Sequence, residues 1–326
     1  MRMRELSRLE IPTQWKGLHS LCWCGDDLVD YAGGLVRYHL DGTQENSRCS
    51  YSYRFDRAVG SPDGEYAVLY ELLGTKGLIL KNDSVVREIN RSFYHADDYE
   101  YPIALFKWVD GRTVIAHCPD EYCRLEIEDI ETGEKMVSRT SKSVDFFHSR
   151  LQVSPKSSYL LSAGWIWHPF DAILVYEIAA AVQRPEILDE GWKDFTGDAP
   201  EEVSTATFLD DSRIILAGQD DTTDESIPTM AVYDLKSKTM SPKRKLQEPL
   251  GTFMALGDYL VGFFEHPKLI DIRTGQIVQK WTDIESGNQH GSILRGAAIP
   301  PHIALDPQNK RFAVGTKEKI IVVQLG

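Results

Sequence analysis

The chain has 326 residues, of which 42% are hydrophobic and 26% are charged, a balance typical of a soluble globular protein with a substantial core. No stretch approaches the roughly 18 consecutive apolar residues of a membrane helix, and no apolar segment follows the basic residues at the start, so we expect no secretory signal. The formal net charge of −13 argues against nucleic acid and anionic membranes as partners, because an acidic surface releases no counterions on meeting them.

Cysteine usage points to the compartment. An odd number of cysteines without a signal segment predicts reduced thiols and therefore a cytoplasmic protein. The five residues are Cys22, Cys24, Cys49, Cys118 and Cys123.

A turn-rich point recurs along the chain and divides it into similar units. Each such turn separates two short apolar segments, and a third apolar segment follows and ends in an acidic or polar residue with a tight turn. The segments are rich in Val, Ile, Leu, Tyr and Phe, as strands are. The turns lie at 24–27, 61–64, 109–112, 154–157, 209–212, 256–259 and 306–309.

Four strands in roughly 40–45 residues form the repeating unit of a propeller blade. We therefore predict a single all-β domain, residues 1–326, that forms a seven-bladed β-propeller. The last unit lacks a fourth strand, and an extended N-terminal segment lacks a partner, so we expect that segment to complete the last blade and close the ring. The expected blades are 18–53, 54–92, 101–140, 148–190, 203–245, 250–283, and 295–326 plus 6–12.

Several of these segments resemble repeats of the WD40 and YVTN-like propeller superfamily. The sequence SPDGEYAVLY at 61–70 resembles the turn between the first two strands of such a repeat. VYDLKSK at 232–238 and IDIRTGQ at 270–276 resemble the end of the third strand, where a Trp-Asp pair is usual and this chain has Tyr-Asp or Ile-Asp. The resemblance covers the whole chain and implies the same seven-bladed architecture.

The expected strand order sorts the loops onto two faces. Connections after the second and fourth strands of each blade share one face, and they are long, acidic and aromatic. The sequence WIWHPF at 165–170 falls there, and strand alternation is expected to send one of its tryptophans into the core and the other into solvent. Both tryptophans could instead cap the core between blades.

The most direct interpretation is a non-catalytic protein-binding scaffold. Large amphipathic aromatic residues are frequent interface anchors, and acidic residues steer basic partners. We therefore expect a basic protein or peptide as partner and no cofactor, and an immunity- or antitoxin-type role is one concrete version. The expected anchors are Trp165, Trp167, His168 and Phe170, and the expected electrostatic rim is Asp120, Glu121, Asp220, Asp221 and Asp224.

A metal-dependent propeller hydrolase or lactonase with its site at the central channel is the alternative. First strands line the channel, so histidines near their starts could converge at its mouth. The candidates are His19, His148, His302 and Asp56. A sensor of a small ligand at the same place is a third possibility.

Two other groups could hold metal. Cys118 and Cys123, beside His117, have a spacing that zinc sites allow, but two reduced cysteines at strand ends are the expected outcome. The acidic sequence DDTTDE at 220–225 lacks the spacing of a calcium-binding EF-hand loop. We expect it to be a solvated loop.

Overall fold

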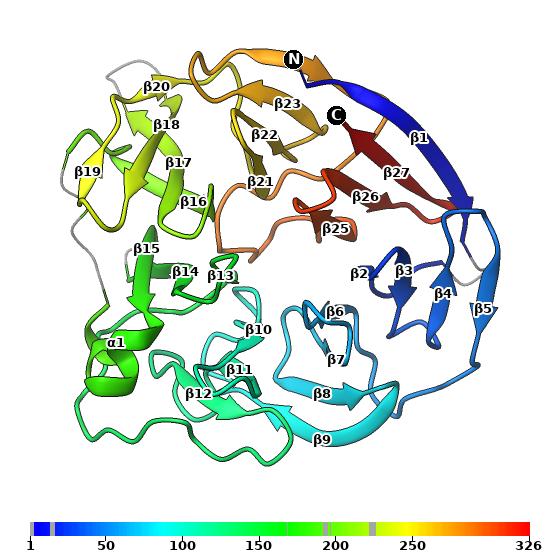
Figure 1. The fold of residues 1–326 in the computed structure, drawn as a ribbon, viewed down its shortest axis with the longest axis horizontal. Helices are drawn as coiled ribbons and strands as arrows, with labels where there is room; N and C mark the ends of the chain where they lie inside the picture. Colours follow the sequence, from blue (N-terminus) through cyan, green and yellow to red (C-terminus); the bar gives the residue numbers. More distant parts are fainter. Residues whose placement is uncertain (1–2, 14–16, 168, 192–194, 196, 222–225) are drawn as a thin grey trace.

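The computed structural model describes residues 3–13, 17–167, 169–191, 195, 197–221 and 226–326. These residues form seven small antiparallel sheets arranged round a ring, with the first strand of each sheet nearest the centre (Figure 1). The predicted all-β, seven-bladed propeller is therefore confirmed. We number the blades 1 to 7 in chain order, beginning with β2.

Four strands, from the centre outward, make up the typical blade. The innermost strands are β2 (Cys22–Cys24), β6 (Arg57–Gly60), β10 (Ala104–Lys107), β13 (Leu151–Val153), β16 (Glu202–Phe208), β21 (Phe253–Leu256) and β25 (Ile303–Asp306). The second strands are β3 (Asp27–Asp30), β7 (Tyr66–Tyr70), β11 (Thr113–His117), β14 (Tyr159–Ile166), β17 (Arg213–Asp221), β22 (Tyr259–Gly262) and β26 (Arg311–Gly315).

The outer half of each blade is more variable. The third strands are β4 (Val36–Tyr38), β8 (Lys76–Lys81), β12 (Glu126–Asp129), β15 (Phe170–Glu177), β18 (Ser226–Asp234), β23 (Lys268–Asp271) and β27 (Lys319–Leu325). The outermost strands are β5 (Gln44–Asn46), β9 (Ser84–Asn90), β19 (Thr239–Met240), β20 (Arg244–Lys245), β24 (Ile277–Lys280) and β1 (Glu5–Pro12). In blade 4 the helices α1 (Ile178–Gln183) and α2 (Ile187–Glu190) follow the third strand.

Burial explains why the second strands are rich in apolar residues. Every residue of β7, β11 and β26 is buried, because each blade is covered on both faces by its neighbours and no position faces water. The outermost β5 is exposed throughout. The cores therefore lie between adjacent blades, each built from apolar side chains of two sheets.

The two ends of the chain close the ring. β1 pairs antiparallel with β27, from Glu5 opposite Leu325 to Pro12 opposite Lys319. Ile11 of β1 is fully buried between blades 7 and 1. The N-terminal strand thus completes the last blade and covers the edge of β27, as predicted from the sequence.

One connection crosses the ring. Residues 282–302, which we call the strap, join β24 to β25 and pass over the centre of the ring (orange in Figure 1). The strap contacts blade 4 where the Ser292 hydroxyl donates to Asp171 at 2.6 Å, and it contacts the segment before β10 where the Leu294 N–H donates to the Asp98 carbonyl at 2.7 Å. On its way back the Pro300 carbonyl accepts from Arg57 of blade 2 at 2.8 Å.

Candidate functional site

The connections that follow the second and fourth strands of the blades emerge at one end of the ring, which we call the long-loop face. They share this end because strand direction alternates in an antiparallel sheet. The turn after β14 carries Trp167, the loop between β11 and β12 carries Asp120 and Glu121, and the segment before β13 carries Phe147. Loops of blades 3 and 4 therefore meet on this face.

Phe147 and Trp165 form the centre of an aromatic cluster there. Their rings are parallel, with centroids 3.8 Å apart and an angle of 9° between the planes. The Phe147 N–H donates to the Trp165 carbonyl at 2.9 Å, and the Trp165 N–H donates to the Phe147 carbonyl at 3.1 Å. Tyr122 stacks on Phe147 at 4.1 Å, and Tyr99 packs edge-on against both rings of the central pair. Trp165 is therefore a core residue, with 3% of its surface exposed.

Trp167 lies against the same cluster but reaches solvent. Its ring is edge-on to His95 at 5.1 Å, to Phe147 at 5.3 Å and to Trp165 at 5.5 Å, and 41% of its surface is exposed. Strand alternation does not explain this difference, because residues two apart in a continuous strand point to the same side. The cause is that β14 ends at Ile166, so Trp167 belongs to the turn.

Arg91 fixes the loop that faces Trp167. Its guanidinium lies over the rings of Tyr99 and Tyr101, 4.7 Å and 4.9 Å from their centroids, and burial lowers the pKa of this arginine. No described carboxylate forms an ion pair with Arg91. Its guanidinium instead links separate backbone segments by donating hydrogen bonds to their carbonyl groups. Its donors reach the carbonyls of Gly74, Ala96 and Tyr99 at 2.7, 2.6 and 3.0 Å.

The loop held by Arg91 presents two more aromatic residues. Phe93 is 86% exposed, and Tyr94 is also exposed while its ring lies 6.3 Å from that of Trp167. Sequence reasoning missed Arg91, because a buried arginine that binds only carbonyls leaves no charge pattern in the sequence.

A cavity of about 540 Å³ opens beside the turn that carries Trp167, between blades 4 and 5. Phe170, at the start of β15, is 42% exposed and lines this cavity. The turn therefore has the aromatic cluster on one side and a cavity on the other. Other lining residues are Val144, Asp145, Phe146, Ile166, Asp171 and Glu201.

The predicted acidic rim is only partly free of basic partners. The Asp120 carboxylate accepts from Lys135 at 3.2 Å, and that of Asp220 accepts from Lys243 at 2.8 Å. Glu121 and Asp221 are exposed, and neither has an ion pair with a described residue. The remaining predicted residues, His168 and Asp224, lie outside the described residues.

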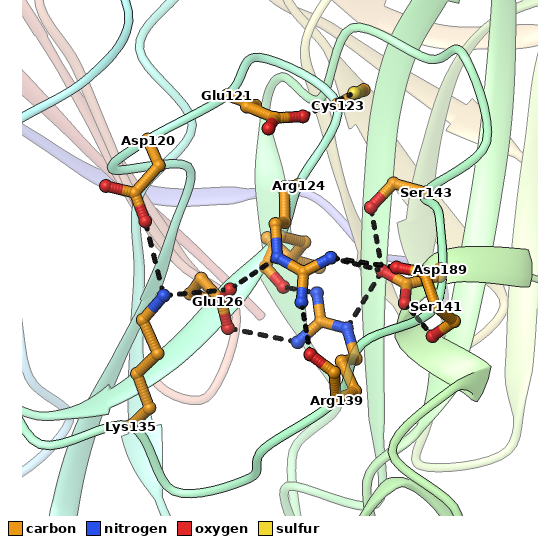
Figure 2. A network of polar contacts seen from close by, with 11 residues as sticks. Asp120, Glu121, Cys123, Arg124, Glu126, Lys135, Arg139, Ser141, Ser143 and Asp189 are labelled. Atoms are coloured by element: carbon orange, nitrogen blue, oxygen red, sulfur yellow. Dashed lines mark hydrogen bonds and ion pairs between the residues drawn. The ribbon is translucent and has the colours of Figure 1, made fainter.

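A buried network of ion pairs lies next to the loops of blade 3. Figure 2 shows Arg124 and Arg139 between the carboxylates of Glu126 and Asp189. Arg139 donates to Asp189 at 2.8 Å and to Glu126 at 3.0 Å, and Arg124 donates to Glu126 at 2.9 Å. Because Asp189 belongs to α2, the network joins blade 3 to blade 4.

Hydroxyl groups complete this network. Burial by itself would raise the pKa of Asp189, but hydrogen bonds from Ser141, Arg139 and Ser143 hold that pKa below its ordinary value. The Val144 N–H also donates to the Asp189 carbonyl at 2.8 Å. The segment 141–145, which borders the cavity, is thereby fixed to α2.

The structure does not bring together the four residues of the channel hypothesis. His148 is fully buried between blades 3 and 4, where its Nδ1 lies 3.1 Å from the Ser162 hydroxyl and burial lowers its pKa to about 3. His302 lies 3.3 Å from Arg57, and burial followed by this guanidinium lowers its pKa to about 3. The Asp56 carboxylate accepts from the Leu72 N–H at 2.7 Å.

His19 is the fourth residue of that hypothesis. It lies near His302 and contributes to lowering the pKa of that residue, while its own N–H donates to Asp30 at 3.0 Å. His19 and His302 are thus neighbours, whereas His148 packs elsewhere. The strap, which passes over this mouth of the channel, was not predicted.

Metal candidates can be placed as well. Cys118 is buried and Cys123 is partly buried, and both are free thiols. Within the part of the chain that the structure describes, no three His, Cys, Asp or Glu side chains converge in an arrangement that could hold a metal ion. His117 lies 3.2 Å from Glu128, with which it forms a buried pair.

No protein-family model and no curated protein matches this chain. Solved structures match its fold. Hydrazine synthase of Kuenenia stuttgartiensis is similar with a TM-score of 0.61 and 12% identity over 96% of this chain and 97% of that chain. The computationally designed Ika8 protein is similar with a TM-score of 0.53 and 12% identity over 97% of this chain and 98% of that chain. Likeness at such identity shows the fold alone.

Several large apolar side chains on the long-loop face are exposed to solvent. Exposed apolar side chains of its loops include Phe93, Tyr94, Ile166, Trp167, Phe170 and Ile299. A rigid scaffold of sheets and buried ion pairs holds most of them in place. No described helix is long and apolar enough to cross a membrane.

Proposed function

We propose that this protein is a binding platform whose long-loop face contacts a basic protein or peptide. The observation that carries the proposal is the exposure of Trp167 and Phe170 on either side of one turn, beside a cavity of about 540 Å³. Clustered exposed apolar residues mark interaction surfaces. Tryptophan and tyrosine are also over-represented among interface residues that carry binding energy.

Charge supports a basic partner. The net charge is −13, and the exposed carboxylates of Glu121, Asp145 and Asp221 border the aromatic surface without an ion pair to a described residue. Charges at an interface rim raise the association rate and orient the partner, while buried aromatic contacts slow dissociation. Neutralisation of a cationic toxin is one instance of this class of interaction.

The preorganisation of the surface favours binding without a large conformational cost. Trp167 rests on the stacked pair of Phe147 and Trp165, and the loop facing it is anchored by Arg91. Side chains that are already held in place lose little entropy when a partner covers them. The surface is therefore suited to a defined partner rather than to transient, nonspecific adhesion.

Affinity capture from native lysate tests the proposal. Wild-type protein, the double variant Trp167→Ala/Phe170→Ala and the control Val85→Ala/Val109→Ala are each immobilised and their captured proteins compared by mass spectrometry. Val85 and Val109 are exposed at the opposite end of the ring, so the control also removes exposed apolar surface.

We expect a basic protein that is retained by wild type and by the control, is lost with the tryptophan–phenylalanine variant, and elutes at moderately raised salt. The captured partner is then purified, and its Kd is measured for wild type and for the tryptophan–phenylalanine variant. We expect the Kd to be at least about tenfold higher for the variant. Identical capture by all three proteins would overturn the proposal.

A further inference from the structure

The cavity between blades 4 and 5 combines aromatic rings with carboxylates. Trp167 and Phe170 line it with exposed rings, and the buried ring of Phe146 contributes to the same lining. Asp145 and Glu201 also line it, as does Asp171. No lysine or arginine is among the described residues that line the cavity.

Among the residues that the structure describes, the three carboxylates accept hydrogen bonds from neutral donors. The Tyr122 hydroxyl donates to Asp145 at 2.7 Å, and the Asp221 N–H donates to Glu201 at 3.3 Å. Asp171 accepts from the hydroxyl and the N–H of Ser292 in the strap, at 2.6 and 3.0 Å. None of the three has a lysine or arginine partner within ion-pair distance among the residues the structure describes, so no described cation of the lining pairs with them.

The surroundings of Asp171 disfavour the charged form of its carboxyl group. Burial is the largest influence on the carboxyl of Asp171 and raises its pKa. Hydrogen bonds from Ser292 and the positive charge of Arg150 lower this pKa, whereas the negative charge of Glu202 raises it. The net shift of the pKa is upward. A raised pKa means that the surroundings disfavour the charged form. A cation entering the cavity would reverse that effect and gain the interaction.

The size and the apolar lining decide what kind of cation fits. At about 30 Å³ per water the cavity holds roughly 18 waters, far more than a bare metal ion and its first shell need. Val144, Ile166 and Phe170 offer apolar surface to the methylene stem of a long side chain, and the carboxylates offer charge to its head group. A cation near the face of Trp167 gains a further electrostatic attraction from the ring.

We propose that this cavity is the receptor for a cationic side chain, an arginine or a lysine, of the basic partner. The assignment rests on the proposed function and makes it more specific: the cavity recognises the charge, and the neighbouring aromatic cluster binds the surrounding partner surface. Trp167 belongs to both, since it lines the cavity and packs on the cluster.

The test uses short labelled peptides and the full-length protein. A fluorescein-labelled peptide with the sequence Gly-Arg-Gly-Arg-Gly-Arg-Gly is titrated with protein and followed by fluorescence anisotropy. Its twin carries citrulline, the neutral isostere, at each arginine, and a third peptide carries lysine. We expect the arginine and lysine peptides to bind at least about tenfold more tightly than the citrulline peptide, because the ring attraction and the carboxylate pairing both require the charge.

Two matched variants separate the cavity from the general acidity of the protein. Asp145→Asn/Glu201→Gln removes two negative charges at the cavity and keeps an acceptor for the Tyr122 hydroxyl and the Asp221 N–H. Asp83→Asn/Glu134→Gln removes two charges from exposed turns at the opposite end of the ring. We expect the first variant to weaken the arginine peptide at least about fivefold and the second to change it by less than about twofold, since distant charges are screened.

Equal binding of the arginine and citrulline peptides, or equal weakening by the two variants, would overturn the assignment. Failure of the cavity and failure of the platform give different results in partner capture. If Trp167→Ala/Phe170→Ala loses the partner while Asp145→Asn/Glu201→Gln retains it fully, the platform stands and the cavity is not the receptor. If neither variant affects capture, both proposals are wrong.

Discussion

The ring of Phe147 lies flat on the indole of Trp165, with 3.8 Å between their centroids, and the same two residues exchange both of their backbone hydrogen bonds. This pair joins the segment before β13 to the end of β14 and provides the surface on which Trp167 rests. Two tryptophans two positions apart therefore have different roles: Trp165 stabilises the fold, and Trp167 is available to a partner.

Truncating the two tryptophans separates these roles. Trp165→Ala is expected to lower the free energy of unfolding by about 3–5 kcal/mol, because it leaves a cavity under a stacked ring. Trp167→Ala is expected to lower it by less than about 1 kcal/mol, because the side chain is 41% exposed and surface truncations are mild. Urea unfolding followed by circular dichroism measures both. Equal losses for the two variants would contradict the division of roles.

The buried network of Figure 2 gives a second prediction. In Arg139→Met, Glu126 and Asp189 each lose an ion pair while remaining buried, and breaking a buried pair on one side costs about 3–5 kcal/mol. The matched variant Arg213→Met breaks an exposed pair with Asp210 and is expected to cost less than about 1 kcal/mol. Urea unfolding of the two variants checks this, and a mild Arg139→Met would show that the carboxylates reach water.

Closure of the ring by β1 gives a third prediction. Ile11→Ala is expected to lower the free energy of unfolding by about 2–5 kcal/mol, because Ile11 is fully buried between the last and first blades and its truncation leaves a cavity. Leu6→Ala lies in the same strand but is 56% exposed, and a change within about 0.5 kcal/mol is expected. Should both variants unfold like wild type, β1 would contribute little to closure.

Much of the architecture could be predicted from the sequence because each blade repeats the same local chemistry. Turns such as 61–64 and 256–259 fall between apolar segments of strand length, and the unpaired N-terminal segment matches the missing strand of the last blade. Because successive strands run in opposite directions, their order alone then assigns each loop to one of the two faces. These features depend on neighbours in the sequence, which is why they can be read from it.

The site depends on contacts that are distant in the sequence. Whether Asp120 and Asp220 are free depends on Lys135 and Lys243, which approach from other strands. The pairing of Ser292 with Asp171 spans 121 positions, and no periodic pattern marks the strap that carries Ser292. His148 was expected near the channel, but its Nδ1 lies against Ser162 of the next strand and the ring is packed between blades.

The buried histidines give the last prediction, a loss of stability in mild acid. Burial lowers the pKa of His148 to about 3 and that of His302 to about 3, whereas an unfolded histidine titrates near 6.5. The stability that these neutral rings contribute is complete above the unfolded pKa and is lost as pH falls toward the folded pKa, because only the unfolded chain binds the protons. Each ring contributes up to about 1.4 kcal/mol per pH unit to that loss.

His148→Gln tests the sign and the size of this effect. Between pH 6 and 5 the variant is expected to lose stability about 1.4 kcal/mol per pH unit less steeply than wild type, since one proton no longer distinguishes the two states. The lowered carboxyl pKa values of Asp189 and Glu128 act only at lower pH, because unfolded carboxyls titrate near 4. His39→Gln is the control: Asp27 raises the pKa of His39, so its contribution is lost as pH rises above 6.5, and the slope below pH 6 stays nearly unchanged. Urea unfolding at half-unit steps from pH 5 to 7.5 measures the slopes, and parallel lines for wild type and His148→Gln would mean that the folded protein already protonates His148 in this range.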